Sequence, residues 1–455
     1  MFGRMDKGTR CMSVLALLTV ASLLIVACAP MAATPAPSAA TQPPAPEEEK
    51  PTKLVVASFY PVDKVSGWDG LVERFKEKHP NVEIEVQVTT FEQYLPKLLS
   101  QIAGGVAPDV VAVENTPFPQ FVQKGILEDL TPFLENTPGF SLDDFFPHLI
   151  DRYTVEGKVY GIPYDAQPNA ILYYNPAIFD EEGVEYPNKD WTWYDLLEAA
   201  KKLTKVDADG NVERYGWDIC GNNWAYFVYS NGGGIVDDVK HPTRSRLDEP
   251  EAIEGVQFYV DMMYKHKVAP SPQTLESLGG YQATANLFIA GKTAMFQCGF
   301  WIAVEHPEEF KDMGVRIAMG PMGPNKTRAY PTGGTAYAIL KSSKNKKLAW
   351  EFITFFLGPV GYEEAYKAAK LGAIYPPAHI PSFEWYMQQP IEFVDTLEPN
   401  KEALNYIIFA PADLRWPEIN SKCVQPEMDL ILRNEKPVEP TMKSIAECVN
   451  AELAK

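Results

Sequence analysis

The chain has 455 residues, of which 46% are hydrophobic and 12% are aromatic, and its formal net charge is −19. This length allows two domains or one large domain, and the hydrophobic content is enough to build real cores. An acidic chain lacks the basic surface that nucleic acids and anionic lipids require, so we exclude nucleic acid as a partner and interpret the charge as an aid to solubility.

The first 28 residues resemble the leader of a bacterial lipoprotein. Basic residues precede an apolar run over 12–26, which is too short to span ~30 Å of hydrocarbon and has the length of a signal-peptide core. The run ends in LLIVAC, which resembles the lipobox, where cleavage leaves a cysteine as the acylated N-terminus. We predict a signal peptide over 1–27 and lipid attachment at Cys28. The alternative is an ordinary secretory signal with a chance cysteine.

Residues 28–52 are predicted to form a lipid-anchored, disordered linker. Their composition is mainly Ala, Pro, Thr, Ser and Gln, and the segment closes with three glutamates and a lysine. Such a segment cannot bury a core and stays extended. No later apolar stretch approaches transmembrane length, so we expect an extracytoplasmic protein that is attached to the cell membrane through Cys28 and is not embedded in it.

The region from residue 53 onward alternates strands with helices. The pattern predicts strands at 53–58, 82–88 and 108–113, separated by helices at 67–79 and 91–103. This order implies a parallel sheet with right-handed crossovers. The same alternation continues, with helices expected at 193–203, 250–267, 281–290, 344–356, 361–369, 419–434 and 439–453, and strands at 295–298 and 315–319.

Four cysteines lie beyond the leader and linker, in a compartment that permits disulfides. Cys423 and Cys448 lie almost equally far from the turn at 436–440, so an antiparallel helix pair would place them side by side. We therefore predict a Cys423–Cys448 disulfide. Cys220–Cys298 is the remaining pair, and free buried thiols are the alternative for it.

Motifs for catalysis, cofactors and metals are missing from the sequence. It contains no Gly-x-Ser-x-Gly elbow, no Walker loop and no dinucleotide-binding glycine fingerprint. The six histidines are scattered without metal-ligand spacing, and 207–211 fits a hairpin turn better than a calcium loop. The sequence therefore predicts a binding protein that is not an enzyme and has no catalytic residue, metal or cofactor.

Polar and aromatic residues follow several predicted strands, at the point where each strand ends. Ligands in open α/β sheets bind beyond the carboxyl ends of strands, so these segments are expected to converge on one cleft. Indole and phenol rings stack on the apolar faces of a pyranose, and carboxylates and amides pair with its hydroxyls. The residues that predict a sugar site in this way are Tyr60, Asp63, Glu114, Asn115, Asp165, Gln167, Trp224 and Trp301.

Seven segments, in this order and at these spacings, resemble the extracellular solute-binding proteins of ABC sugar importers, the maltose-binding-protein-like family. They cover a small-residue stretch before Pro-Asp and a strand, a "GxLxxLTP"-like segment, a Tyr-Gly-Ile-Pro-Tyr motif followed by Leu-Tyr-Tyr-Asn-Pro, a "TWDEL"-like segment and a late Gly-Lys-Thr-Ala-Met before Gly-Phe-Trp. The residues are 102–111, 125–132, 159–164, 172–179, 191–196, 288–295 and 299–301.

The resemblance implies an α/β, two-lobed periplasmic-binding-protein-like fold with a ligand cleft between the lobes. Three hinge crossings are expected near 164–168, 332–335 and 384–395. The N-terminal lobe would be 53–164 plus 336–385, and the C-terminal lobe 165–332 plus 386–455. The family's ligand contacts carry over onto the strand-end residues named above and onto Gly334, with Arg415 and Trp416 as a late aromatic contact.

One departure concerns the family's usual Gly-Pro-Trp, which is Gly299-Phe300-Trp301 here and follows Cys298. Phe300 is expected to add a stacking wall or to narrow the pocket.

The resemblance also implies that the protein captures a sugar, expected to be an oligosaccharide, by hinge closure and delivers it to the transmembrane subunits of an ABC permease. One alternative keeps the fold and changes the ligand to a polyol, a glycerol phosphodiester, a peptide or an opine. Another is a secreted glycoside hydrolase with Glu114 and Asp165 as its acid–base pair. A third is an adhesion or scaffold lipoprotein with a vestigial cleft.

Overall fold

The computed structural model describes residues 51–60, 68–114, 117–332 and 334–455. The predicted signal peptide, the lipid site at Cys28, nearly all of the linker, Asp63 and Asn115 lie outside these residues. Within them, no helix combines the length and apolarity needed to cross a membrane.

The first sheet contains five strands among the described residues, in the order β2-β1-β3-β13-β6. β1 runs parallel to β2 and β3, whereas β13 runs antiparallel to β3 and β6. The predicted strand and helix alternation is therefore present. The elements are β1 (Thr52–Ser58), α1 (Trp68–Lys78), β2 (Val82–Val88), α2 (Phe91–Ala103), β3 (Val110–Glu114), α3 (Phe118–Gln123), β6 (Ile162–Pro163) and β13 (Thr335–Ile339).

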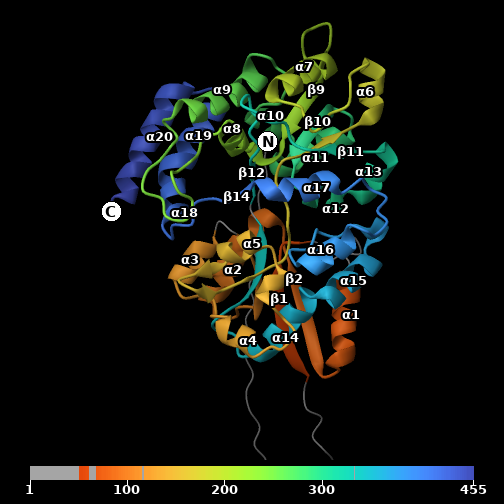
Figure 1. The fold of residues 1–455 in the computed structure, drawn as a ribbon, viewed down its shortest axis with the longest axis vertical. Coiled ribbons are helices and arrows are strands. Elements are labelled where there is room, and N and C mark those ends of the chain that lie inside the picture. The colour runs from red at the N-terminus through yellow and green to blue at the C-terminus, as the bar shows by residue number, and fades with distance from the viewer. Residues whose placement is uncertain (1–50, 61–67, 115–116, 333) are drawn as a thin grey trace, which may run out of the picture. The chain divides into compact units, whose positions relative to one another are not determined.

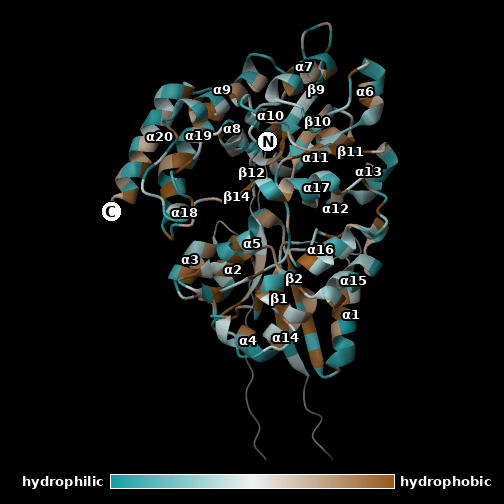
Figure 2. Cartoon of the chain, viewed as in Figure 1, coloured by the Kyte–Doolittle hydropathy of each residue, from teal (hydrophilic) through white to brown (hydrophobic). Residues whose placement is uncertain are grey.

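Hydrophobic strands and amphipathic helices form the core around this sheet. Residues 110–113 of β3 are buried, and Trp68 at the start of α1 packs against Phe356, with 4.6 Å between ring centroids. Phe356 ends α14 (Lys346–Phe356), which is followed by α15 (Pro359–Ala368) against α1. Figure 2 shows hydrophobic residues concentrated on these strands, while α1 is largely hydrophilic on its outer side.

The second described sheet also has five strands, in the order β11-β7-β10-β9-β8. β9 and β10 are parallel neighbours, and β7 pairs antiparallel with β10 and β11. The fully buried Trp193 and Trp217 pack around Phe227 between this sheet and its helices. The elements are β7 (Ile171–Tyr174), α6 (Pro176–Glu182), α7 (Trp193–Leu203), β8 (Lys205–Val206), β9 (Val212–Ile219), α8 (Trp224–Ser230), α9 (Pro250–Tyr264), α11 (Ala283–Ile289), β10 (Thr293–Cys298), α12 (Trp301–Glu305), α13 (Pro307–Met313) and β11 (Arg316–Ala318).

The described chain passes between the two sheets three times. It crosses from β6 to β7, from β12 (Tyr330–Pro331) to β13, and from α16 (Ile380–Tyr386) to α17 (Glu398–Ala403), which contacts β7. Figure 1 shows α16 beside the first sheet and α17 beside the second. A parallel ribbon of β12 and β14 (Ile407–Ile408) lies next to the second crossing. We propose the lobe limits given above as the division of the chain.

The predicted helix at 419–434 is interrupted. The structure has α18 (Trp416–Ile419), a π-helical segment at Asn420–Val424 and then α19 (Gln425–Leu432). Pro426 lies at the start of α19, and a proline cannot donate the backbone hydrogen bond of a regular turn, which accounts for the change of helix type. The predicted helix at 439–453 is α20 (Val438–Leu453).

Two disulfides join the described cysteines, in the same pairs that the sequence predicts. Cys423 in the π-helical segment is bonded to Cys448 in α20, with 5.6 Å between Cα atoms. Cys220 is bonded to Cys298 across the ends of β9 and β10, with 5.2 Å between Cα atoms.

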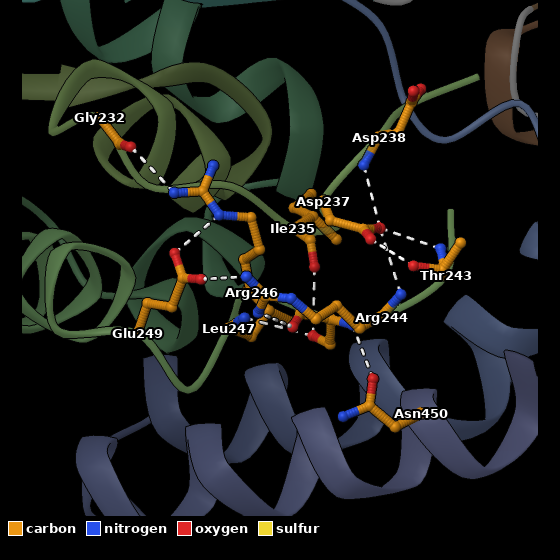
Figure 3. Close-up of polar contacts among 11 residues, drawn as sticks. Gly232, Ile235, Asp237, Asp238, Thr243, Arg244, Arg246, Leu247, Glu249 and Asn450 are labelled. Carbon is orange, nitrogen blue, oxygen red and sulfur yellow. Dashed lines mark hydrogen bonds and ion pairs between the residues drawn. The ribbon is translucent and has the colours of Figure 1, made fainter. Parts of the chain in front are cut away.

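Two ion pairs connect the proposed lobes outside the three crossings. Lys240 Nζ lies 2.7 Å from Asp151 Oδ2, and Lys370 Nζ lies 3.1 Å from Glu308 Oε1. Lys240 belongs to the loop between α8 and α9, which is held by hydrogen bonds between its own residues. Figure 3 shows the carboxylate of Asp237 accepting hydrogen bonds from several groups of this loop, and Asn450 of α20 bonding to the loop's backbone.

Candidate functional site

Residues from both sheets and from two of the crossings line one cavity of about 320 Å³. Tyr60 follows β1, Glu114 ends β3, and Trp301 begins α12 after β10. Because these strands direct their carboxyl ends toward the same space, residues far apart in sequence meet there. The sequence-predicted residues that line this cavity are Tyr60, Glu114, Asp165, Gln167, Trp301 and Gly334.

A second cavity of about 350 Å³ adjoins the first, because Asn169 and Trp301 line both. Trp224 lines the second cavity, as do the bonded cysteines Cys220 and Cys298. The two cavities together form one cleft, and we call them the acidic cavity and the aromatic cavity. Four carboxyl groups line the acidic cavity, whereas the described lining of the aromatic cavity contains no charged side chain.

Asp165 holds the floor of the acidic cavity together. Its side chain is buried, and its Oδ2 accepts hydrogen bonds from the Tyr60 hydroxyl at 2.7 Å and from Gln167 Nε2 at 2.6 Å. Its Oδ1 accepts from the Thr335 amide at 3.1 Å. Burial raises the pKa of Asp165, and these hydrogen bonds oppose the rise. Asp165 therefore orients the residues around it and links β1 to two crossings.

Glu114 is another carboxyl group of this cavity. It is half-buried at the end of β3, directly opposite Thr335 in the sheet, and makes no hydrogen bond to another described residue. Burial and the nearby charge of Asp165 raise the pKa of Glu114 to about 8. At pH 7 Glu114 is thus mainly protonated, so it can both donate and accept hydrogen bonds.

Gln167 offers a second polar group to a ligand. Its side chain is only 4% exposed, and its amide nitrogen donates to Asp165. Its carbonyl oxygen Oε1 has no hydrogen-bond partner within the described part of the chain. A buried acceptor without a partner costs about 1–3 kcal/mol, so a ligand hydroxyl that donates to it would be favoured.

Trp301 is packed closely against the turn that precedes it. A Cβ atom added to Gly299 would lie 2.5 Å from Asn169 Oδ1 and 2.6 Å from Trp301 Cδ1. Only glycine leaves room for the indole and the amide at this point. The expectation for Phe300 is wrong, because its ring is fully buried, packs against Phe393 and lines neither cavity.

Arg415 and Trp416 also line neither cavity. The guanidinium of Arg415 bonds both carboxylate oxygens of Asp413, at 3.1 and 2.8 Å, and the indole of Trp416 is buried at the start of α18. The assignment of Arg415 and Trp416 to the ligand site stays a prediction.

Several lining residues were not predicted from the sequence. Asn169 lies two positions beyond Gln167 in the first crossing. This alternation of polar residues is the one sequence signal that could have identified it. Glu305 ends the short helix α12, and Phe409 follows β14, so both positions depend on tertiary structure. The unpredicted residues of the two cavities include Phe91, Asn169, Gln282, Glu305, Thr335 and Phe409. Among the described residues there is no group of His, Cys, Asp and Glu that could hold a metal ion.

Known proteins with similar sequences are binding proteins. A binding protein of Brucella abortus is 26% identical over 288 residues, which are 62% of this chain and 66% of that protein. The arabinooligosaccharide-binding protein of Bacillus subtilis is 26% identical over 301 residues, covering 63% of this chain and 65% of its own length. The matches thus span slightly less than two thirds of these relatives.

Solved structures resemble nearly the whole described body. An ABC substrate-binding protein from Listeria monocytogenes in complex with cycloalternan has a TM-score of 0.76 and 26% identity, covering 89% of this chain and 99% of that one. The GacH receptor of Streptomyces glaucescens, at 20% identity and a TM-score of 0.74, shares the two-lobed fold. The family model described as bacterial extracellular solute-binding protein matches residues 61–363, which is more than half of the chain. The chain therefore belongs to the bacterial extracellular solute-binding protein family.

Proposed function

We propose that this protein is the substrate-binding component of an ABC importer, and that it captures an oligosaccharide and delivers it to a membrane permease. The observation that carries the proposal is the pair of adjoining cavities that share Trp301 and Asn169. Support comes from relatives named for arabinooligosaccharides and maltotriose and from the cycloalternan complex of a similar structure.

The chemistry of the cleft suits a sugar of more than one ring. The acidic cavity presents Glu114 and the free acceptor of Gln167 to hydroxyl groups, while Trp224 and Trp301 offer indole faces to C–H surfaces. Each cavity is near the lower end of the ~300–1,000 Å³ typical of ligand pockets, so a chain of rings extending through both uses the whole cleft.

The proposed closure of the cleft depends on ligand contacts from both of its sides. Tyr60 and Glu114 belong to the first sheet's side of the cleft, whereas Trp224 and Trp301 belong to the second. A ligand that touches both sides binds the closed form more tightly than the open form, so it shifts the population toward closure. The crossings supply the hinges.

The enzymatic alternative receives little support from the geometry. A hydrolase would need Asp165 free to transfer protons or attack a sugar, but Asp165 is buried and already accepts three hydrogen bonds. We propose a binding role without catalysis for this pair, and a chromogenic-glycoside assay should detect no turnover.

The same proposal includes the membrane anchor. The leader over 1–27, the lipid on Cys28 and the spacer over 28–52 would keep the binding body outside the cytoplasm and near its permease. Expression of Cys28→Ala should release the protein from the membrane fraction and abolish incorporation of labelled palmitate. Unchanged membrane association and labelling would contradict the anchor.

Binding itself is tested by calorimetry and thermal shift on the purified chain. The panel contains maltotriose, arabinotriose and cellotriose together with their monosaccharides, and we expect at least one trisaccharide to bind more tightly than its monosaccharide. A folded protein that shows no heat of binding and no thermal shift across a broad oligosaccharide panel would refute the proposed function.

A further inference from the structure

The Cys220–Cys298 disulfide forms part of the wall of the aromatic cavity. Cys220 directly follows β9, and Cys298 is the last residue of β10. These strands are parallel neighbours in which Gln297 lies opposite Ile219, so the cysteines occupy the next position in register. The bond therefore joins two loops at the point where they leave the sheet.

The loop after Cys220 turns sharply before it presents an aromatic ring to the cavity. Gly221 and Asn222 both have positive φ values, 65° and 51°, a conformation that glycine and asparagine tolerate better than other residues. Trp224 then begins α8, four residues after the cysteine. The position of this indole thus depends on a short, tightly turned connection to the sheet.

The loop after Cys298 is equally short. Trp301 begins α12 three residues beyond the cysteine, and its indole lies against Gly299 so closely that a Cβ there would be 2.6 Å from Trp301 Cδ1. A shift of this turn would therefore move the indole. Two of the aromatic residues that line this cavity, Trp224 and Trp301, therefore lie just beyond the two ends of one covalent bond.

We propose that the Cys220–Cys298 disulfide is a positioning element of the binding site, which fixes the spacing of the Trp224 and Trp301 indoles for one sugar chain. Stacking on two rings tolerates displacements of only about 0.5 Å before contacts are lost, so a crosslink at the strand ends preserves the site before ligand arrives. This inference rests on the proposed function. It extends that function by assigning the bond a role in recognition.

The second disulfide provides a matched control. Cys423–Cys448 joins the π-helical segment to α20 and lines neither cavity. The comparison is between Cys220→Ser/Cys298→Ser and Cys423→Ser/Cys448→Ser, each measured as the full folded body. Both double variants lose one crosslink, but only the first loses it beside the tryptophans.

The first readout needs no sugar. Hydrogen–deuterium exchange followed by mass spectrometry should show faster exchange in 221–226 and 299–304 for the first variant, with no change there in the control. Unchanged exchange in both segments would overturn the positioning role. This measurement decides the question even if the protein binds no sugar in the panel, an outcome that would count against the proposed function alone.

The second readout is the affinity for maltotriose by titration calorimetry. We expect the Kd to rise roughly tenfold for the first variant and to change within about twofold for the control. W224A is then added to each background. Loss of the bond should reduce the effect of W224A, because the ring is then already misplaced. Equal affinities in the two double variants would overturn the inference.

Folding is checked by far-UV circular dichroism. Should the serine variant fail to fold, Cys220→Ala/Cys298→Val retains apolar contacts without the bond and is measured in its place. Failure of both to fold, while the control folds, would overturn the inference by assigning the bond to the stability of the whole lobe.

Discussion

The acidic and aromatic cavities meet at Trp301 but differ in what they offer a ligand. The acidic cavity gathers Glu92, Glu114, Asp165 and Glu305. The aromatic cavity presents Trp224, a disulfide and asparagine side chains, with no charge in its described lining. Charged side chains are thus confined to one half of the described lining, whereas aromatic side chains line both halves. The division implies that substitutions in the two halves should have different dependences on ligand length and on pH.

The largest effect is expected from W301A, because this indole belongs to both cavities. Truncation of a central aromatic contact typically costs about 2–3 kcal/mol, which corresponds to a loss of roughly 30- to 150-fold in affinity. W301F should lose less, since it retains a ring. Calorimetry with the tightest trisaccharide of the panel measures both. Affinity of W301A within threefold of the parent would contradict the shared role of this residue.

A smaller and length-dependent effect is expected from W224A, which alters only the aromatic cavity. Removal of one stacking face should cost about 1–1.5 kcal/mol, or roughly tenfold, for a trisaccharide. A monosaccharide that occupies the acidic cavity should be affected much less. Equal losses for the two ligands would show that the cavities do not act as separate subsites.

The charge difference between the cavities should appear in the pH dependence of stability. Glu114 has a pKa raised from 4.5 to about 8 by burial and by Asp165, so the folded state holds a proton that the unfolded state releases. The contribution of Glu114 to the free energy of unfolding is full below pH 4.5 and is lost as the pH rises through 8. The free energy of unfolding therefore falls over that range. E114Q should flatten this decline by an amount on the order of 1–3 kcal/mol in chemical denaturation.

Asp218 supplies a control outside both cavities. It is buried in β9, and burial raises its pKa from 3.8 to about 7. D218N should likewise flatten the decline in the free energy of unfolding between pH 4 and 7, but it should leave sugar affinity unchanged. E114Q should alter both the pH dependence of stability and the sugar affinity. A parent whose unfolding free energy is constant from pH 5 to 8 would contradict the raised pKa of both groups.

The smallest effect concerns the ion pair between Lys240 and Asp151, which connects the two proposed lobes. Both side chains are more than half exposed, at 64% and 57%, and exposed pairs contribute about 0–1 kcal/mol. D151N should therefore weaken sugar binding by no more than about fivefold at low salt and have no effect at high salt. An equal loss at both salt concentrations would point to a role other than charge pairing.

Local patterns in the sequence predict much of the fold. The alternating residues at 82–88 and the periodic apolar residues at 91–103 match β2 and α2 to the residue. Neighbouring residues determine these elements, so a window of the sequence contains the necessary information. The helix at 419–434 is different, because Pro426 interrupts an otherwise helical pattern.

The site is predictable where strand ends determine it and unpredictable where distant partners do. Tyr60, Glu114 and Trp301 follow strands, and the edge of an α/β sheet brings them together. Phe300 also follows a strand, but its ring pairs with Phe393, which is 93 positions later in the chain. Its burial depends on the third crossing, and no local pattern reveals it.

The hydrogen bonds of Asp165 have a consequence for how occupancy is sensed. This carboxyl lies in the first crossing. It accepts a hydrogen bond from the backbone amide of Thr335, which lies at the end of the second crossing. Gln167, which it orients, lines the acidic cavity. Asp165 therefore bonds directly both to a residue that lines the cavity and to a residue of the second crossing. Under the proposed function, a sugar that bonds to Gln167 would therefore act on the proposed hinge segments through direct hydrogen bonds.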